Sequence, residues 1–229
     1  MRVSFLTSAL LIAALGQVGV ASASVLIDDF DGTTLDTTKW IVTSGAPTVS
    51  DSVLSMTGSE WSTRDRIDSV AAYDNGIDIL VAAAPTGRGY LGVQTADGNS
   101  NFLIRTDGIN DTYPSWVAEV WNVTVSGQPD TEDSSAFTIS AGDVLGLRYT
   151  TTGVALYQNG SLLWETTSGL GLSAADAHIV LASSGDGNTA PNAVEVGSVS
   201  HCPVPEPHAV VLLLTGLFGL LAYAWRKRK

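Results

Sequence analysis

Apolar and polar residues alternate in short runs from residue 25 to residue 199, and no run keeps a helical period. Val, Ile, Leu, Thr and aromatic residues dominate the runs, and clusters of Gly, Asp, Asn and Pro separate them. The pattern predicts strands over residues 25–30, 40–43, 53–57, 67–72, 77–83, 90–95, 101–105, 115–125, 137–139, 144–150, 154–158, 161–166, 178–182 and 193–199. So many strands in one domain indicate two antiparallel sheets packed face to face, an all-β sandwich.

The clearest predicted hairpin joins residues 154–158 to residues 161–166 through Asn159 and Gly160. An Asn-Gly pair readily adopts the positive φ angles that a type I′ turn requires. The two runs should therefore pair as neighbouring antiparallel strands.

The N-terminal end of the chain has the composition of a secretory signal. Arg2 supplies positive charge, residues 3–20 are mostly apolar, and Ala21, Ser22 and Ala23 match the small-residue cleavage pattern. We therefore expect signal peptidase to remove residues 1–23, and the rest of the chain to be exported.

The C-terminal end carries a second apolar segment, residues 208–225. As a helix it would be about 27 Å long, enough to cross a hydrocarbon core once. Arg226, Lys227, Arg228 and Lys229 follow it directly and favour the cytoplasmic side. Cleavage of the N-terminal signal places the other end outside, so both ends predict the same topology.

Pro205, Glu206 and Pro207 precede this segment. Together with the apolar helix and the basic end, they resemble the PEP-CTERM sorting domain. The resemblance implies an exported protein of a Gram-negative, exopolysaccharide-producing bacterium, anchored transiently in the inner membrane, cut near the motif by a membrane-embedded exosortase, and delivered to the cell surface or extracellular matrix. The alternative is a plain membrane anchor. The predicted parts are a signal peptide (1–23), a β-sandwich domain (24–199), a linker (200–204) and a sorting tail (205–229).

Charge and cysteine content limit what the domain can do. Residues 24–207 hold 6 basic and 23 acidic residues, a formal net charge of −17. Such a charge repels phosphate backbones, so we expect no nucleic-acid partner. Cys202 is the only cysteine, which excludes an intrachain disulfide. The domain must therefore be stabilised by its core.

Two stretches resemble concanavalin A-like lectin/glucanase domains, a group that includes laminin G-like domains. Residues 28–40 with residues 53–56 are similar to the entry strands of that superfamily. Residues 143–150, with the hairpin turn at Asn159 and Gly160, are similar to its late strands. The resemblance implies an antiparallel jelly-roll β-sandwich.

Laminarinase-type glycosyl hydrolases of this fold place Glu-x-Asp-x-x-Glu on one strand, and this chain lacks that motif. Glu119 is the nearest candidate, but Trp121 and Val123 occupy the positions where a second carboxylate would be needed. His178 has no cysteine or second histidine in the domain to complete a transition-metal site. We therefore predict no catalytic residue and a protein that is not an enzyme. The alternative is a divergent polysaccharide-active hydrolase or lyase.

Glycan binding is the remaining function for which the sequence offers candidate residues. Glu119 and Trp121 project from one face of a predicted strand, and Trp116 projects from the other. An aromatic surface beside a polar group is suited to a sugar, although either face could instead be core. The sequence thus predicts a non-catalytic surface or matrix protein that binds exopolysaccharide, with a structural envelope protein as the alternative.

Two oxygen-rich loops are candidates for Ca²⁺, through Asp97 with Asn99 and Asp186 with Asn188. Neither loop has the full spacing of a calcium-binding loop. Asp and Asn are also the ordinary residues of turns. We predict no confident metal site and no other cofactor.

Overall fold

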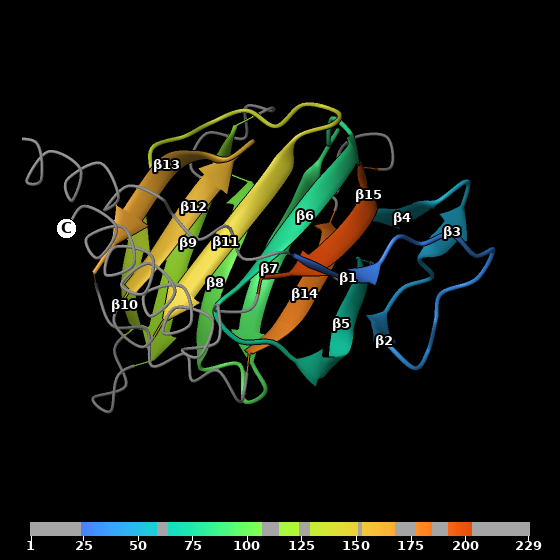
Figure 1. Ribbon diagram of the computed structural model, residues 1–229, viewed down its shortest axis with the longest axis horizontal. Helices are drawn as coiled ribbons and strands as arrows, with labels where there is room; N and C mark the ends of the chain where they lie inside the picture. The colour runs from blue at the N-terminus through green and yellow to red at the C-terminus, as the bar shows by residue number, and fades with distance from the viewer. Residues whose placement is uncertain are drawn as a thin grey trace, which may run out of the picture. The chain divides into compact units, whose positions relative to one another are not determined.

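The computed structural model describes residues 24–58, 64–106, 115–123, 129–150, 153–167, 177–184 and 192–202. One compact unit spans Ser24–Pro203. Within it, an eight-stranded and a seven-stranded antiparallel sheet form two layers (Figure 1), which confirms the predicted all-β sandwich. Among the residues described, no helix has the length and apolar character needed to cross a membrane. The predicted signal peptide and the predicted helix over 208–225 lie outside the described residues.

The first sheet, sheet A, has β11 and β6 at its centre. Its strands follow the order β13 (Ser161–Thr166), β12 (Gly153–Gln158), β11 (Val144–Thr150), β6 (Gly76–Ala83), β15 (Asn192–His201), β4 (Val53–Gly58) and β3 (Thr48–Ser50), and β1 (Val25–Asp28) also pairs with β15. The predicted hairpin is confirmed, because Gln158 pairs with Ser161 and both Asn159 and Gly160 have positive φ.

The second sheet, sheet B, carries the candidate site described below. Its strands follow the order β10 (Pro129–Asp133), β9 (Trp116–Val123), β8 (Ser100–Thr106), β7 (Arg88–Thr95), β14 (Ala177–Ser184), β5 (Asp65–Ala72) and β2 (Trp40–Ser44). β14 comes late in the chain but lies between β5 and β7.

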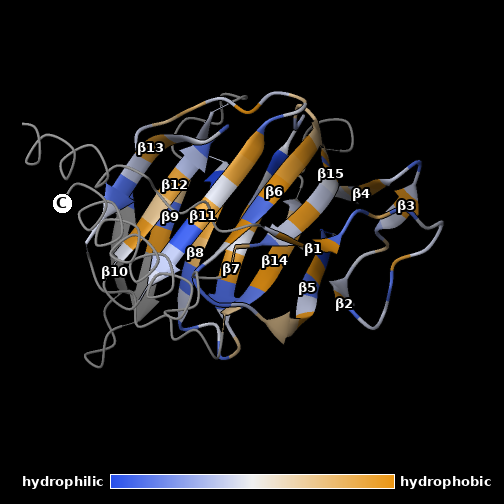
Figure 2. Ribbon diagram, in the orientation of Figure 1, coloured by the Kyte–Doolittle hydropathy of each residue, from blue (hydrophilic) through white to orange (hydrophobic). Residues whose placement is uncertain are grey.

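The core lies between the two sheets and is built by alternation along the strands. Ile77, Ile79 and Val81 on β6 are fully buried, while Asp78 between them is partly exposed. Figure 2 shows polar and apolar bands along the strands of both sheets. Each strand thus buries one face and offers the other to solvent, as the sequence pattern predicts.

The entry segment joins the two sheets through a buried polar contact. Trp40 begins β2 of sheet B, is 1% exposed, and donates its Nε1 hydrogen to Asp28 Oδ2 on β1 of sheet A at 2.7 Å. Asp28 Oδ1 also accepts from the Phe30 backbone nitrogen at 3.1 Å. This carboxylate therefore positions the residues that resemble the entry strands of concanavalin A-like domains.

The predicted set of strands differs from the structure in three places. The strand predicted over 137–139 is a single bridge, in which Phe137 pairs with Trp116. The strands β3 and β10 were not predicted, because their short or acidic sequences lack apolar alternation.

Candidate functional site

Outward-facing side chains of sheet B border two adjoining cavities of about 350 Å³ and about 410 Å³. Arg66, Gln94 and Val180 line both, so the two cavities lie side by side on this face, and together we call them the sheet B trough. It crosses the strands from Ile41 on β2 to Glu119 on β9. Strands spaced by about 4.8 Å give this path a length of about 24 Å. The trough could therefore hold an extended molecule.

The trough is lined by the residues that alternate with the core on each strand. Leu91 and Val93 of β7 point inward and are fully buried, as are Phe102 and Ile104 of β8. The residues between them line the trough, namely Arg88, Tyr90 and Gln94 on β7 and Asn101, Leu103 and Arg105 on β8. The same period-two pattern brings Arg66 and Asp68 of β5 to this face.

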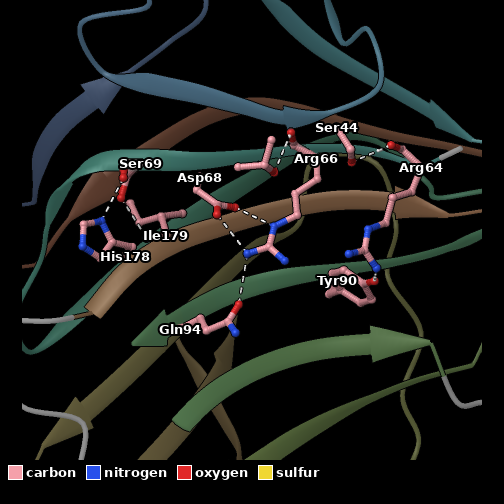
Figure 3. Close-up of polar contacts among 10 residues, drawn as sticks. Ser44, Arg64, Arg66, Asp68, Ser69, Tyr90, Gln94, His178 and Ile179 are labelled. Atoms are coloured by element: carbon pink, nitrogen blue, oxygen red, sulfur yellow. Dashed lines mark hydrogen bonds and ion pairs between the residues drawn. The ribbon is translucent and has the colours of Figure 1, made fainter. Parts of the chain in front are cut away.

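Two arginines reach from the β5 side across β14 to β7 (Figure 3). Arg66 donates from Nη2 to Gln94 Oε1 at 3.1 Å, and Arg64 donates from Nη1 to Tyr90 Oη at 2.8 Å. Arg66 is also held by Asp68 through two bonds, of 2.7 and 2.9 Å. These contacts fix the guanidinium groups over the middle of the trough.

A third arginine, Arg105, bridges two carboxylates at the β9 end. Its Nε lies 2.7 Å from Glu119 Oε2, and its Nη2 lies 3.3 Å from Asp133 Oδ2. Glu119 and Asp133 are direct partners in the β9–β10 register. The acidic groups at this end of the trough are therefore paired with a cation.

Tyr90 and Asn101 add an aromatic surface and an unsatisfied acceptor. Burial raises the pKa of the Tyr90 hydroxyl, a shift that the nearby Arg64 partly opposes. Asn101 is 7% exposed and lines the larger cavity, yet among the described residues its Oδ1 atom has no hydrogen-bond partner. Buried polar atoms normally have a hydrogen-bond partner, so the Oδ1 atom of Asn101 suggests a role beyond folding.

The structure separates the three predicted glycan contacts. Glu119 lines the trough. Trp116 is 1% exposed and belongs to the core, so its prediction as a glycan contact is wrong; it faces the opposite side of β9 from Glu119. For Trp121 only the backbone is described, where it pairs with Asn101 and Thr131.

Sequence reasoning missed the arginines of the trough. Arg64, Arg66, Arg88 and Arg105 are four of the six basic residues between positions 24 and 207. Each lies on or directly before a strand at an outward position. Basic residues at alternate strand positions were visible in the sequence. Only the order of the strands in the sheet shows that these arginines lie near one another.

Turn chemistry accounts for the described calcium candidates. Asp97 Oδ1 accepts from the Asn99 backbone and from Thr95, and Asp97 Oδ2 accepts from Asn99 Nδ2 at 2.8 Å. Asp186 and Asn188 lie outside the described residues. Within the described ranges no group of three His, Cys, Asp or Glu side chains could hold a metal ion.

Cys202 lies on sheet A, away from the trough. Its Sγ donates to Asp78 Oδ2 at 3.0 Å. Burial and this hydrogen bond raise the pKa of the Cys202 thiol to about 12. Because the thiolate is the reactive form, we expect iodoacetamide at pH 8 to label Cys202 at least about tenfold more slowly in the folded chain than in urea. Equal rates in the two states would contradict this environment.

Solved structures with the same fold act on polysaccharides and other glycans. An endo-acting O-glycanase of the human gut microbiota has a TM-score of 0.60 at 11% identity, covering 78% of this chain and 98% of that one. The apo Crh5 transglycosylase has a TM-score of 0.60 at 15% identity, covering 82% and 87%. The kappa-carrageenase of Pseudoalteromonas carrageenovora, in complex with an oligotetrasaccharide of kappa-carrageenan, has a TM-score of 0.57 at 14% identity, covering 80% and 97%.

These structures share the fold of this chain and correct one prediction. We expected a protein that is not an enzyme, on the ground that Glu-x-Asp-x-x-Glu is missing. That prediction is overturned, because the structures with the same fold are glycanases and a transglycosylase.

The sequence comparisons identify the tail. No curated protein matches the chain. The family model of the PEP-CTERM protein-sorting motif matches residues 203–229, which include Pro205, Glu206 and Pro207. The motif marks an exported protein that is anchored transiently at the membrane and processed by an exosortase, a membrane enzyme. The chain thus joins a PEP-CTERM protein-sorting motif to a β-sandwich with the fold of glycanases such as the endo-β-1,3(4)-glucanase of family GH16.

Proposed function

We propose that the protein is delivered to the surface or extracellular matrix of a Gram-negative bacterium and binds a polysaccharide chain there in the sheet B trough. The sorting tail supports the delivery, since an exosortase substrate is exported. The trough supports the binding, since it is long and shallow and crosses six strands. Such a shape suits an extended polymer better than a compact metabolite, which prefers an enclosed pocket.

The main structural support for polysaccharide binding is Asn101. Its Oδ1 atom is a buried acceptor to which no residue in the described ranges donates, at the edge of a cavity that Tyr90 and four arginines also line. A buried unsatisfied acceptor costs about 1–3 kcal/mol in the free protein. A sugar hydroxyl could supply the missing donor, and the Tyr90 ring could support the apolar face of a sugar ring.

Cleavage of the bound chain is a second candidate, favoured by one observation. Glu119 and Asp133 face each other directly across β9 and β10. Such partners have Cβ atoms about 4.5–5.5 Å apart, near the carboxyl separation of about 5–5.5 Å in retaining glycosidases. Asp68, which lines the trough from β5, lies four strands from Glu119, about 19 Å away, which is too far for such a pair. Arg105 contacts both candidates, at 2.7 Å from Glu119 and 3.3 Å from Asp133.

The proposal is tested with the full-length chain in mild detergent, titrated with laminarin, dextran, polygalacturonate and the exopolysaccharide of its own host. Release of reducing ends is followed in the same samples. Binding of at least one polymer supports the proposal. Binding of none contradicts it and favours a structural envelope protein. Reducing ends that disappear in a Glu119→Gln variant would establish the second candidate.

An Asn101→Leu variant separates binding from folding. We expect its affinity for the bound polymer to fall about tenfold, because the hydroxyl acceptor is lost. Its free energy of unfolding should stay equal or rise, since a buried unsatisfied oxygen is replaced by an apolar group of similar size. Urea denaturation provides the second measurement. A variant that keeps its affinity would show that Asn101 does not contact the ligand.

A further inference from the structure

Charge on the surface of this domain is distributed very unevenly. The segment 24–207 has a formal net charge of −17 and only six basic residues. Four of these, Arg64, Arg66, Arg88 and Arg105, line the larger cavity of the sheet B trough, together with a single carboxylate, Glu119. The larger cavity is therefore locally basic in a strongly acidic domain, while Asp68 and Asp97 line the smaller cavity.

Three of the four arginines are held in place by the contacts described above, before any ligand binds. Arg66 is fixed by Asp68 and Gln94, Arg105 by Glu119 and Asp133, and Arg64 by Tyr90. Asp68 and Gln94 accept hydrogen bonds from the Nε and Nη2 atoms of Arg66, so these two residues engage only some of its five N–H donors. Guanidinium groups fixed in this way lose little conformational freedom when they bind an oxyanion.

Arginine is also the side chain best matched to planar or tetrahedral oxyanions. Its parallel N–H groups form two hydrogen bonds with one carboxylate or sulfate, which are stronger than bonds to neutral acceptors. A neutral glucan offers only hydroxyl groups, and binding these does not require the positive charge of four guanidinium groups. A polymer with one acidic group on each repeat could meet several of these arginines along the trough.

We propose that the ligand of the sheet B trough is a polyanionic polysaccharide, whose carboxylate or sulfate groups bind to Arg64, Arg66, Arg88 and Arg105. The inference rests on the proposed function and names the substrate class. Acidic groups elsewhere on the domain repel such a polymer, so the trough also determines where it can bind. Screening of these charges by salt should weaken binding.

Two matched ligand pairs test the proposal with the full-length chain in mild detergent. Dextran sulfate is compared with dextran, and polygalacturonate with its methyl ester, so that each pair differs only in its anionic groups. We expect the acidic member of at least one pair to bind at least about tenfold more tightly than its neutral partner. The pair that responds distinguishes sulfate from carboxylate.

Protein variants then place the interaction in the trough. An Arg64→Gln/Arg88→Gln variant should lose about tenfold or more in affinity for the acidic polymer. Arg148→Gln is the matched control, because Arg148 is on sheet A, where it pairs with Asp78 at 2.7 Å, and it should leave the affinity unchanged. An Arg64→Lys/Arg88→Lys variant keeps the charge but loses the paired N–H donors, so its affinity should lie between those of the native chain and the Gln variant. Urea denaturation of the Gln variant shows whether it folds as the native chain does.

The outcomes separate this inference from the proposed function. Equal affinity for the acidic and neutral members of both pairs, unaffected by the arginine substitutions, would overturn the polyanion inference while polysaccharide binding stands. An equal loss in Arg148→Gln would also overturn it, because the attraction would then not be local. Binding of an oligonucleotide as tight as that of the polysaccharide would replace it with a nucleic-acid partner. Failure to bind any polymer would refute the proposed function itself.

Discussion

An Asp65→Ala variant is expected to lose about 4 kcal/mol in its free energy of unfolding. Asp65 is 5% exposed and begins β5 of sheet B. Its Oδ1 accepts from the Ala46 backbone nitrogen at 2.7 Å, and its Oδ2 accepts from the Thr57 nitrogen on β4 of sheet A, also at 2.7 Å. The variant leaves both backbone donors without this acceptor, at a cost of about 1–3 kcal/mol each.

The chain around Asp65 is shaped for this contact. Gly45 has a φ of +77°, and a Cβ atom at this position would collide with the Asp65 Oδ1 atom. Only glycine combines that backbone conformation with so close an approach. One carboxylate therefore connects the turn before β3, the end of β4 and the start of β5.

Urea denaturation of the full-length chain in mild detergent, followed by tryptophan fluorescence, measures this loss. Asp68→Ala is the matched control, because the same carboxylate is removed from the outer face of the same strand. There the loss is a part-exposed ion pair with Arg66, for which we expect about 1 kcal/mol or less. Equal losses in the two variants would contradict the role of Asp65.

The alternation of apolar and polar residues along the chain was sufficient to predict most of the strands. Residues 144–150 and 161–166 coincide with β11 and β13, and the Asn-Gly turn sets the register of the hairpin. The strand β10 was missed for a physical reason. It begins with Pro129 and carries Asp130, Glu132 and Asp133. Proline and charge are features of edge strands, and they remove the apolar alternation that marks a strand inside a sheet.

The candidate site could be predicted only in part. Alternation placed Glu119 and Trp116 on opposite faces of one strand but could not decide which face was core; Trp116 proved to be buried, and Glu119 lines the trough. The arginines of β5 meet Tyr90 and Gln94 of β7 because β14 inserts between these strands. β14 lies about 90 residues after β7 in the sequence, so no local sequence pattern predicts that the two strands are neighbours.

A Pro205→Ala/Glu206→Ala variant is expected to lose processing completely in the native host. These residues belong to the PEP-CTERM motif and lie outside the described residues. Pro205 and Glu206 are the residues that the exosortase would recognise, so the variant loses two of the three residues of the motif. Pro207 remains and still lacks a backbone donor, so the expected loss is one of recognition rather than of backbone conformation.

Intact mass of the protein from outer-membrane and extracellular fractions provides the measurement. The native chain should end near Pro207, whereas the variant should keep Arg226 to Lys229 and stay in the inner membrane. Pro203→Ala removes a proline at the start of the matched region, before Pro205, and is the matched control, which should be processed normally. If the native chain itself keeps its basic end, the tail is a plain anchor. Sheet B would then face a polymer at the inner membrane, and a matrix polysaccharide could no longer be its partner.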